Sequence, residues 1–214
     1  MKKINITIDG IKIKAEEGEI LLKVAIENNI YIPNLCFVKE STLTPASCRL
    51  CFVEIAGKKE PVTACTVKVT EGMEVYTNTD EVIRLRKKAF ALLMSTHRIE
   101  CKTCHKNKNC ELQNMAKYLK TPLIPKNMEK LYKTLPINTS HPIFSYDPGK
   151  CILCGRCVLI CNEIVKKRLL NFAYRGIKTI ITISPSTNSD CSSCLKCVNM
   201  CPAGALILKS DPKI

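Results

Sequence analysis

Fifteen cysteines stand among the 214 residues, and a cysteine can form a disulfide, act as a nucleophile or bind a metal. The count is odd, so complete pairing within the chain would leave one thiol over. The N-terminal residues lack the apolar core of a secretory signal, and no stretch approaches the ~18 apolar residues of a membrane span. We therefore expect a reducing, cytoplasmic location, in which clustered cysteines bind metal rather than pair as disulfides.

The first group of cysteines predicts a [2Fe–2S] cluster. Its members are Cys36, Cys48, Cys51 and Cys65. The short gap between Cys48 and Cys51 lets one tight loop supply two thiolates, while the outer gaps differ from the plant-type ferredoxin spacing. A structural zinc ion is the alternative, although zinc sites more often join two closely spaced pairs of ligands.

The second group combines a histidine with three cysteines and predicts a [4Fe–4S] cluster. Its members are His97, Cys101, Cys104 and Cys110. If the preceding helix continues, His97 and Cys101 lie four residues apart on one face. His105 is the rival nitrogen ligand, but it is adjacent to Cys104, where binding the same cluster would be strained. We favour His97 because the three cysteines otherwise lack a fourth ligand.

The third and fourth groups repeat one spacing, C-x2-C-x2-C-x3-C. They are Cys151, Cys154, Cys157 and Cys161, and then Cys191, Cys194, Cys197 and Cys201. This is the two-cluster ferredoxin spacing, in which the fourth cysteine of each run binds the other cluster. Only the second run continues with proline, because Asn162 follows Cys161. We predict one [4Fe–4S] cluster on Cys151, Cys154, Cys157 and Cys201, and another on Cys191, Cys194, Cys197 and Cys161.

The four groups use every cysteine, so no thiol is left for nucleophilic catalysis. The eight glycines form neither a GxGxxG motif nor a P-loop, and the sequence contains no HExxH motif. We assign no catalytic residue. One [2Fe–2S] and three [4Fe–4S] clusters, which exchange single electrons, are the whole of the predicted chemistry.

The formal net charge of +14 raises the alternative of a zinc-rich module that binds nucleic acid. That charge counts each cysteine as neutral, whereas the four ligated clusters would carry about seven negative charges together. The corrected charge weakens the nucleic-acid alternative. Two basic runs, at 84–88 and 166–168, could steer an acidic partner or could simply form solvated faces.

The first 77 residues are predicted to form a β-grasp domain. Apolar residues alternate on both sides of Asp9-Gly10, which predicts a hairpin over 1–14. A helix is expected over 19–29, where apolar residues recur at helical spacing. A second hairpin is expected from strands at 52–55 and 61–64, followed by a last strand at 73–76.

The rest of the chain is predicted to contain two smaller domains and a connector. A helix over 80–96 is expected to have Asp80 as its cap and an apolar stripe that includes Leu92, and a shorter helix is expected over 111–120. Five prolines between 121 and 148 indicate an extended segment. We place a His/Cys3 domain at 78–120, a connector at 121–142 and a two-cluster ferredoxin-like domain at 143–214.

Taken in this order, the four ligand groups resemble a known family over roughly residues 1–208. They are similar to the N-terminal region of the large iron–sulfur subunit of respiratory complex I, and to the same region of multi-cluster [FeFe]-hydrogenases. They also resemble the small diaphorase-type iron–sulfur subunit of NAD(P)-linked [NiFe]-hydrogenases. The sequence ends at Ile214, before the catalytic domain of the longer relatives would begin, so we favour the diaphorase-type subunit.

The resemblance implies an α+β chain and a non-catalytic electron-transfer role in a hetero-oligomeric oxidoreductase complex. The expected partners are an NAD(P)-handling flavoprotein subunit and a catalytic subunit, with a hydrogenase as the first choice. A formate dehydrogenase or an electron-bifurcating complex is the alternative context. A stand-alone soluble ferredoxin or redox sensor is the remaining possibility, and neither nucleic acid nor membrane insertion is expected.

Overall fold

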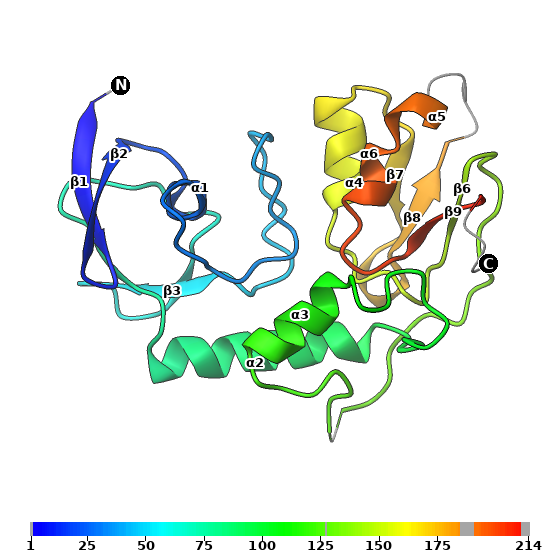
Figure 1. Cartoon of the computed structure of the whole chain (residues 1–214), viewed down its shortest axis with the longest axis horizontal. Helices are drawn as coiled ribbons and strands as arrows, with labels where there is room; N and C mark the ends of the chain where they lie inside the picture. The colour runs from blue at the N-terminus through cyan, green and yellow to red at the C-terminus, as the bar shows by residue number, and fades with distance from the viewer. Residues whose placement is uncertain (1, 127, 185–190, 211–214) are drawn as a thin grey trace.

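The computed structural model describes residues 2–126, 128–184 and 191–210. A sheet with one packed helix forms the N-terminal part, and the cysteine repeat forms a separate unit of short strands and helices (Figure 1). The long helix α2 (Asp80–Ser95) runs beneath both parts and connects them. The predicted domain 143–214 includes residues 185–190 and 211–214, which lie outside the described residues.

The N-terminal sheet has five strands in the order β2-β1-β5-β3-β4. Their bounds are β1 (Lys3–Ile8), β2 (Ile11–Glu16), β3 (Phe52–Ile55), β4 (Val62–Thr63) and β5 (Glu74–Tyr76). The two hairpins and the last strand confirm the sequence prediction, and β5 lies between them, parallel to β1. Asp9 and Gly10 both have positive φ, 48° and 82°, as a type I′ hairpin turn requires.

One hydrophobic core lies between this sheet and helix α1 (Leu21–Glu27). Alternate residues of β1, namely Ile4, Ile6 and Ile8, are at most 2% exposed. Helix α1 contributes four residues from one face, Leu21, Leu22, Val24 and Ala25. The alternate residues of β1 and one face of α1 therefore cover the same core from opposite sides.

Helix α2 forms where it was predicted, but three details differ. Thr79 rather than Asp80 is the N-cap, because its side-chain oxygen accepts a hydrogen bond from Val82 N–H at 3.3 Å. Leu92, which was expected in the apolar stripe, is 57% exposed. Arg86, which was expected in a basic run, is only 2% exposed and donates from Nη2 to the Phe52 carbonyl at 2.6 Å.

A second hydrophobic core joins parts of the chain that the sequence analysis treated as separate domains. It contains Leu35 and Leu50 from the loops of the N-terminal sheet, Phe90 and Met94 from α2, and Ile152 from the first ferredoxin run. Helix α3 (Glu111–Tyr118), at the predicted position, adds Leu112, Met115 and Ala116. Because this core is shared, the cysteine loops of all three parts pack against one another.

The connector between α3 and the third part forms neither helix nor strand in its described residues, 119–126 and 128–143. The Leu131 N–H donates to the Ser95 carbonyl at 2.8 Å, and Asn138 pairs with Tyr146. These bonds hold the connector against the domains on either side, as expected for an extended segment.

Two short antiparallel sheets frame the C-terminal cysteine repeat. Strand β6 (Phe144–Tyr146) pairs with β9 (Leu206–Leu208), and β7 (Leu170–Ala173) pairs with β8 (Ile180–Ile183). The repeat itself forms α4 (Arg156–Leu159), the π-helical turn η1 (Ile160–Ile164), α5 (Cys191–Cys194) and α6 (Lys196–Asn199), and the 3-10 turn η2 (Gly176–Lys178) lies between β7 and β8.

The repeat is visible in the backbone as well as in the sequence. Gly155 and Leu195 each follow the second cysteine of a run, and they have positive φ values of 77° and 43°. Each residue lies directly before a helix, α4 or α6, that carries the third cysteine of its run. No helix within the described part of the chain is long and apolar enough to cross a bilayer.

Candidate iron–sulfur sites

The first predicted ligand group lies on loops at one end of the N-terminal sheet. Cys36, Cys48, Cys51 and Cys65 are each at most 2% exposed. The sulfurs of Cys36 and Cys48 are 3.4 Å apart, and the Leu35 N–H points at the Cys48 sulfur at 3.4 Å. Hydrogen bonding between the thiols lowers the pKa of Cys36 to about 6, and the Cys65 thiol likewise lowers the pKa of Cys51. The same bonds raise the pKa of Cys48 and of Cys65, so within each pair one thiol loses its proton more readily than the other.

The second predicted group surrounds a small cavity. Its lining includes all four predicted ligands, His97, Cys101, Cys104 and Cys110, whereas His105 is not part of it. His105 lies instead beside Gly204, where an added Cβ would be 3.1 Å from its Cε1 atom. The structure thus brings the three cysteines together with His97 and turns the rival histidine toward another loop.

His97 is held so that one ring nitrogen is available to a metal. Its Nδ1 is 2.8 Å from the Lys150 carbonyl oxygen, so Nδ1–H donates and Nε2 carries the free lone pair. Burial lowers the pKa of His97, which favours the neutral imidazole that a metal ligand must be. Histidine ligands generally have their other nitrogen fixed in this way.

We predict that replacing His97 removes one cluster, whereas replacing His105 does not. His97→Ala should lower the iron content by about four atoms per chain, because three cysteines alone hold the [4Fe–4S] cluster poorly. His97→Cys should keep the iron and lower the reduction potential, since a thiolate adds one negative charge. Iron analysis and electron paramagnetic resonance (EPR) of the reduced protein measure both effects.

His105→Ala is the matched control for this prediction and should retain full iron content. Loss of the same EPR signal in His105→Ala, with a normal signal in His97→Ala, would show that His105 is the ligand.

In space, the third ligand group consists of three cysteines of the first run and one of the second, and these four side chains line one cavity. Cys151, Cys154 and Cys157 share this cavity with Cys201, as the crossed pattern requires. Burial raises the pKa of Cys154, so this thiol stays protonated until a metal displaces the proton.

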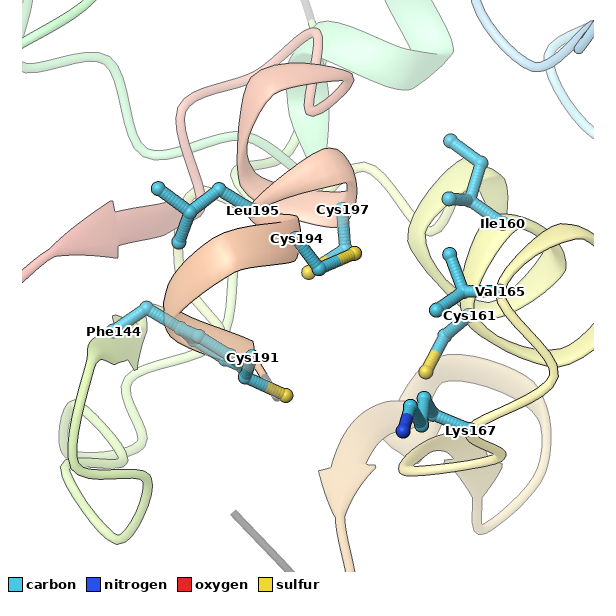
Figure 2. A pocket seen from close by; sticks show the side chains of 9 residues that line it. All are labelled: Phe144, Ile160, Cys161, Val165, Lys167, Cys191, Cys194, Leu195 and Cys197. Atoms are coloured by element: carbon cyan, nitrogen blue, oxygen red, sulfur yellow. The ribbon is translucent and has the colours of Figure 1, made fainter. Parts of the chain in front are cut away.

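The fourth predicted group shows the reciprocal crossing. Figure 2 shows the sulfurs of Cys191, Cys194 and Cys197 on one wall of a cavity and the sulfur of Cys161 on the opposite wall. The Lys167 side chain lies beside Cys161 and points toward the same space. Burial raises the pKa of Cys197 to about 12. The two runs therefore exchange their fourth cysteines in space, although they are 40 residues apart in sequence.

Backbone N–H groups point at sulfurs of the first, third and fourth groups, and Cys110 of the second group also accepts from the backbone. Besides Leu35, the donors include Leu153 to Cys151 at 3.4 Å, Leu169 to Cys161 at 3.4 Å and Ala205 to Cys201 at 3.3 Å. Such N–H···S bonds stabilise thiolates and are one means by which proteins set cluster potentials. The donor sets and their surroundings therefore fit iron–sulfur clusters.

None of the fifteen cysteines, all of which lie within the described residues, forms a disulfide. Within the described residues, no three His, Cys, Asp or Glu side chains converge closely enough to hold a single metal ion.

Direct contacts connect the third group to its neighbours. Ser47, next to Cys48, donates to the Cys154 carbonyl at 3.2 Å. On the side of the second group, the Cys110 thiol is 4.0 Å from the carbonyl oxygen of Pro202, which follows Cys201. The buried Arg156 also forms an ion pair with Glu111 at 2.9 Å. The third group thus lies next to both the first and the second.

A buried aspartate, which the sequence analysis missed, fixes the junction of the second and third groups. Asp147 is fully buried, and its carboxylate accepts from Arg98 Nη2 at 2.6 Å and from Gly149 N–H at 2.9 Å. Lys150 Nζ lies 3.9 Å from the same carboxylate. Arg98 follows His97, and Lys150 supplies the carbonyl that orients His97. The Asp-Pro-Gly turn just before Cys151 was the available sequence signal.

Three family descriptions match successive parts of the chain. Residues 1–80 match a 2Fe-2S iron-sulfur cluster binding domain. Residues 86–122 match the NADH-ubiquinone oxidoreductase-G iron-sulfur binding region, and residues 142–207 match the ferredoxin-like domain of NADH-quinone oxidoreductase subunit 3. The chain therefore contains a [2Fe–2S]-binding domain and [4Fe–4S]-binding ferredoxin-like regions in a mixed α and β fold.

A relative of similar length decides the family. The gamma subunit of the NAD-reducing hydrogenase HoxS from Cupriavidus necator is 30% identical over 209 residues, which cover 96% of this chain and 87% of that subunit. This chain belongs to the same family of iron–sulfur subunits. A crystal structure of an NAD+-reducing [NiFe]-hydrogenase supports this with a TM-score of 0.86 and 28% identity, over 97% of this chain and 88% of the matched chain. The resemblance expected from the motifs is thereby confirmed.

Longer members of the family align with this chain over only part of their length. The alpha subunit of an NADPH-Fe(3+) oxidoreductase from Geobacter sulfurreducens is 34% identical over 206 residues, 96% of this chain but 24% of the relative. The chain thus spans about a quarter of the length of that relative.

Proposed function

We propose that the chain relays electrons through one [2Fe–2S] and three [4Fe–4S] clusters and performs no catalysis of its own. The observation that carries this proposal is the set of three cavities, each lined by one predicted [4Fe–4S] ligand group. The four buried thiols of the first group complete the set. When bound, clusters at these positions would accept and donate single electrons, which is the chemistry expected of such centres.

The residues around the ligand groups have supporting roles in this proposal. Backbone N–H groups stabilise the thiolates, and the Lys150 carbonyl orients His97. The shared core and the contacts of Ser47 and Pro202 keep adjacent groups close together. Close, rigidly held centres are what a relay needs.

The proposed domain division follows the ligand groups. A β-grasp [2Fe–2S] domain occupies residues 1–77, and a small His/Cys3 domain occupies 78–120. A connector covers 121–142, and a two-cluster ferredoxin-like domain covers 143–214. The five-stranded sheet with α1 and the two short sheets of the repeat support this division.

The proposed partners are an NAD(P)-handling flavoprotein subunit and a catalytic subunit, in a cytoplasmic hetero-oligomer. The names of the HoxS gamma subunit and of the matched crystal structure favour a hydrogenase as the catalytic partner. A formate dehydrogenase is the second candidate, because a relative from Staphylococcus haemolyticus carries the name putative formate dehydrogenase.

Reduction of the assembled complex by a nicotinamide tests the relay. The tagged chain would be purified without oxygen from its own cells together with its bound subunits, and EPR would follow its clusters. We expect NADH or NADPH to reduce the clusters in the complex, whereas the isolated chain should need dithionite. Clusters that dithionite reduces but that neither nicotinamide reduces in the complex would contradict the proposed function.

A further inference from the structure

An open apolar groove of about 600 Å³ lies outside the four ligand groups. One side is formed by connector residues 131–135, and the other by residues from the segment 174–180, which spans the turn between β7 and β8 and the first residue of β8. Its rim exposes large apolar side chains, with Tyr174 72%, Ile177 63% and Leu135 47% exposed. Exposed apolar side chains gathered in one place indicate an interaction surface more often than isolated ones do.

The two segments that line the groove carry charges of one sign only. Residues 131–135 and 174–180 contain three charged side chains, Lys133, Arg175 and Lys178, and no carboxylate. The nearest acidic residue along the connector is the exposed Glu129, which is followed by Lys130. An apolar centre with an arginine, tyrosines and lysines around it is suited to a protein surface that carries carboxylates.

The groove lies directly beside the third ligand group. Ile180 lines the groove, while the next residue, Ile181, lines the cavity of Cys151, Cys154 and Cys201. On the other side, the Lys133 carbonyl lies 2.8 Å from the position that a Cβ on Gly149 would take. A protein bound in the groove would therefore be separated from this ligand group by about one layer of side chains.

We propose that this groove is the docking site of an electron-transfer partner subunit that presents an apolar side chain surrounded by carboxylates. The inference rests on the proposed relay function and names the face through which the third group exchanges electrons. Charge complementarity steers the partner to the groove, and burial of Tyr174, Ile177 and Leu135 holds it there. The basic runs at 84–88 and 166–168 are not needed for this docking.

The test compares two matched double variants in the complex purified from the organism's own cells. Ile177→Asp with Lys178→Glu changes the groove. Ile11→Asp with Lys12→Glu makes the same changes in the β1–β2 hairpin, where Ile11 is 58% exposed. We expect the groove variant to bind its partner at least tenfold more weakly, and the hairpin variant to bind within twofold of the wild type. Both should keep the iron content of the wild type.

Hydrogen exchange provides an independent readout that needs no substitution. Amides of residues 131–135 and 174–180 should exchange more slowly in the complex than in the isolated, cluster-loaded chain. Lys178→Glu alone should weaken binding most at low salt, because the lost attraction is electrostatic.

The outcomes separate this inference from the proposed function. If nicotinamide reduces the clusters of the groove-variant complex and its partner affinity is unchanged, the docking site is wrong and the relay stands. Equal loss of binding in both double variants, or unchanged hydrogen exchange at the groove, also overturns the docking site. Groove-dependent binding of nucleic acid or anionic vesicles in place of a protein overturns it as well. A chain that always purifies without a partner overturns both proposals.

Discussion

Replacing Cys201 by serine is expected to abolish the cluster of the first ferredoxin run, although Cys201 belongs to the second. In the structure, Cys201 shares a cavity with Cys151, Cys154 and Cys157. Serine is a poor iron ligand at this position, so iron content should fall by up to about four atoms per chain. The EPR spectrum of reduced Cys201→Ser should match that of Cys154→Ser.

The reciprocal variant is the control for this experiment. Cys161→Ser should match Cys194→Ser instead, because Cys161 faces the cavity of the second run. A Cys201→Ser spectrum that matches Cys194→Ser would show that each run binds its own cluster, and the crossed assignment would be wrong.

Replacing Asp147 by asparagine is expected to destabilise the whole chain. The buried carboxylate pairs with Arg98 at 2.6 Å, and Lys150 lies 3.9 Å from it. Removing one partner of a buried ion pair costs about 3–5 kcal/mol, and the lower end applies here because Glu100 still pairs with Arg98. For a chain of this size, about 3 kcal/mol corresponds to a fall in melting temperature of roughly 6–12 °C. Anaerobic thermal unfolding of the cluster-loaded protein measures this change.

A surface ion pair provides the comparison for Asp147. Glu81 and Arg84 form an exposed pair one turn apart on α2, so Glu81→Gln should unfold at the wild-type temperature. If Asp147→Asn also unfolds at the wild-type temperature, the buried network does not hold the junction. We further expect Asp147→Asn to disturb the EPR signal of the His97 group first, since Arg98 and Lys150 flank that histidine.

Local sequence patterns predicted the elements that local forces determine. Asp9-Gly10 specifies its turn through the φ values it tolerates, and the alternation of Ile4, Ile6 and Ile8 specifies a buried strand face. Cysteine spacing predicted groups of side chains that the fold brings together, because short gaps restrict how one loop can surround a cluster. Whether these groups bind the predicted clusters is for the experiments above to decide.

Tertiary partners were harder to predict. Arg86 was assigned to an exposed basic run, yet it lies between Val82 and Phe90 at intervals of four residues and shares their buried face. The four-residue spacing of Arg86 from Val82 and Phe90 therefore indicated a buried position. Only the hydrogen bond to the Phe52 carbonyl at 2.6 Å explains how an arginine is tolerated at that buried position. Asp147 is a similar case, because its partner Arg98 is 49 residues away in sequence.

The three predicted domains also pack against one another in the structure. The predicted domains follow one another along the chain, and Leu35, Phe90, Leu112 and Ile152 from all three of them share one core. Such a core depends on how separate amphipathic faces meet, and periodicity within each element does not specify that. Loops that carry neighbouring ligand groups pack on this shared core, which supports the close placement that the proposed relay needs.

The iron and sulfide content of the anaerobically purified chain tests the central claim most directly. One [2Fe–2S] and three [4Fe–4S] clusters predict ~14 iron atoms and a similar number of sulfides per chain. Reduced samples should show EPR signals from both cluster types. A colourless protein with stoichiometric zinc, or a fully loaded chain with only about ten iron atoms, would contradict the four-cluster account.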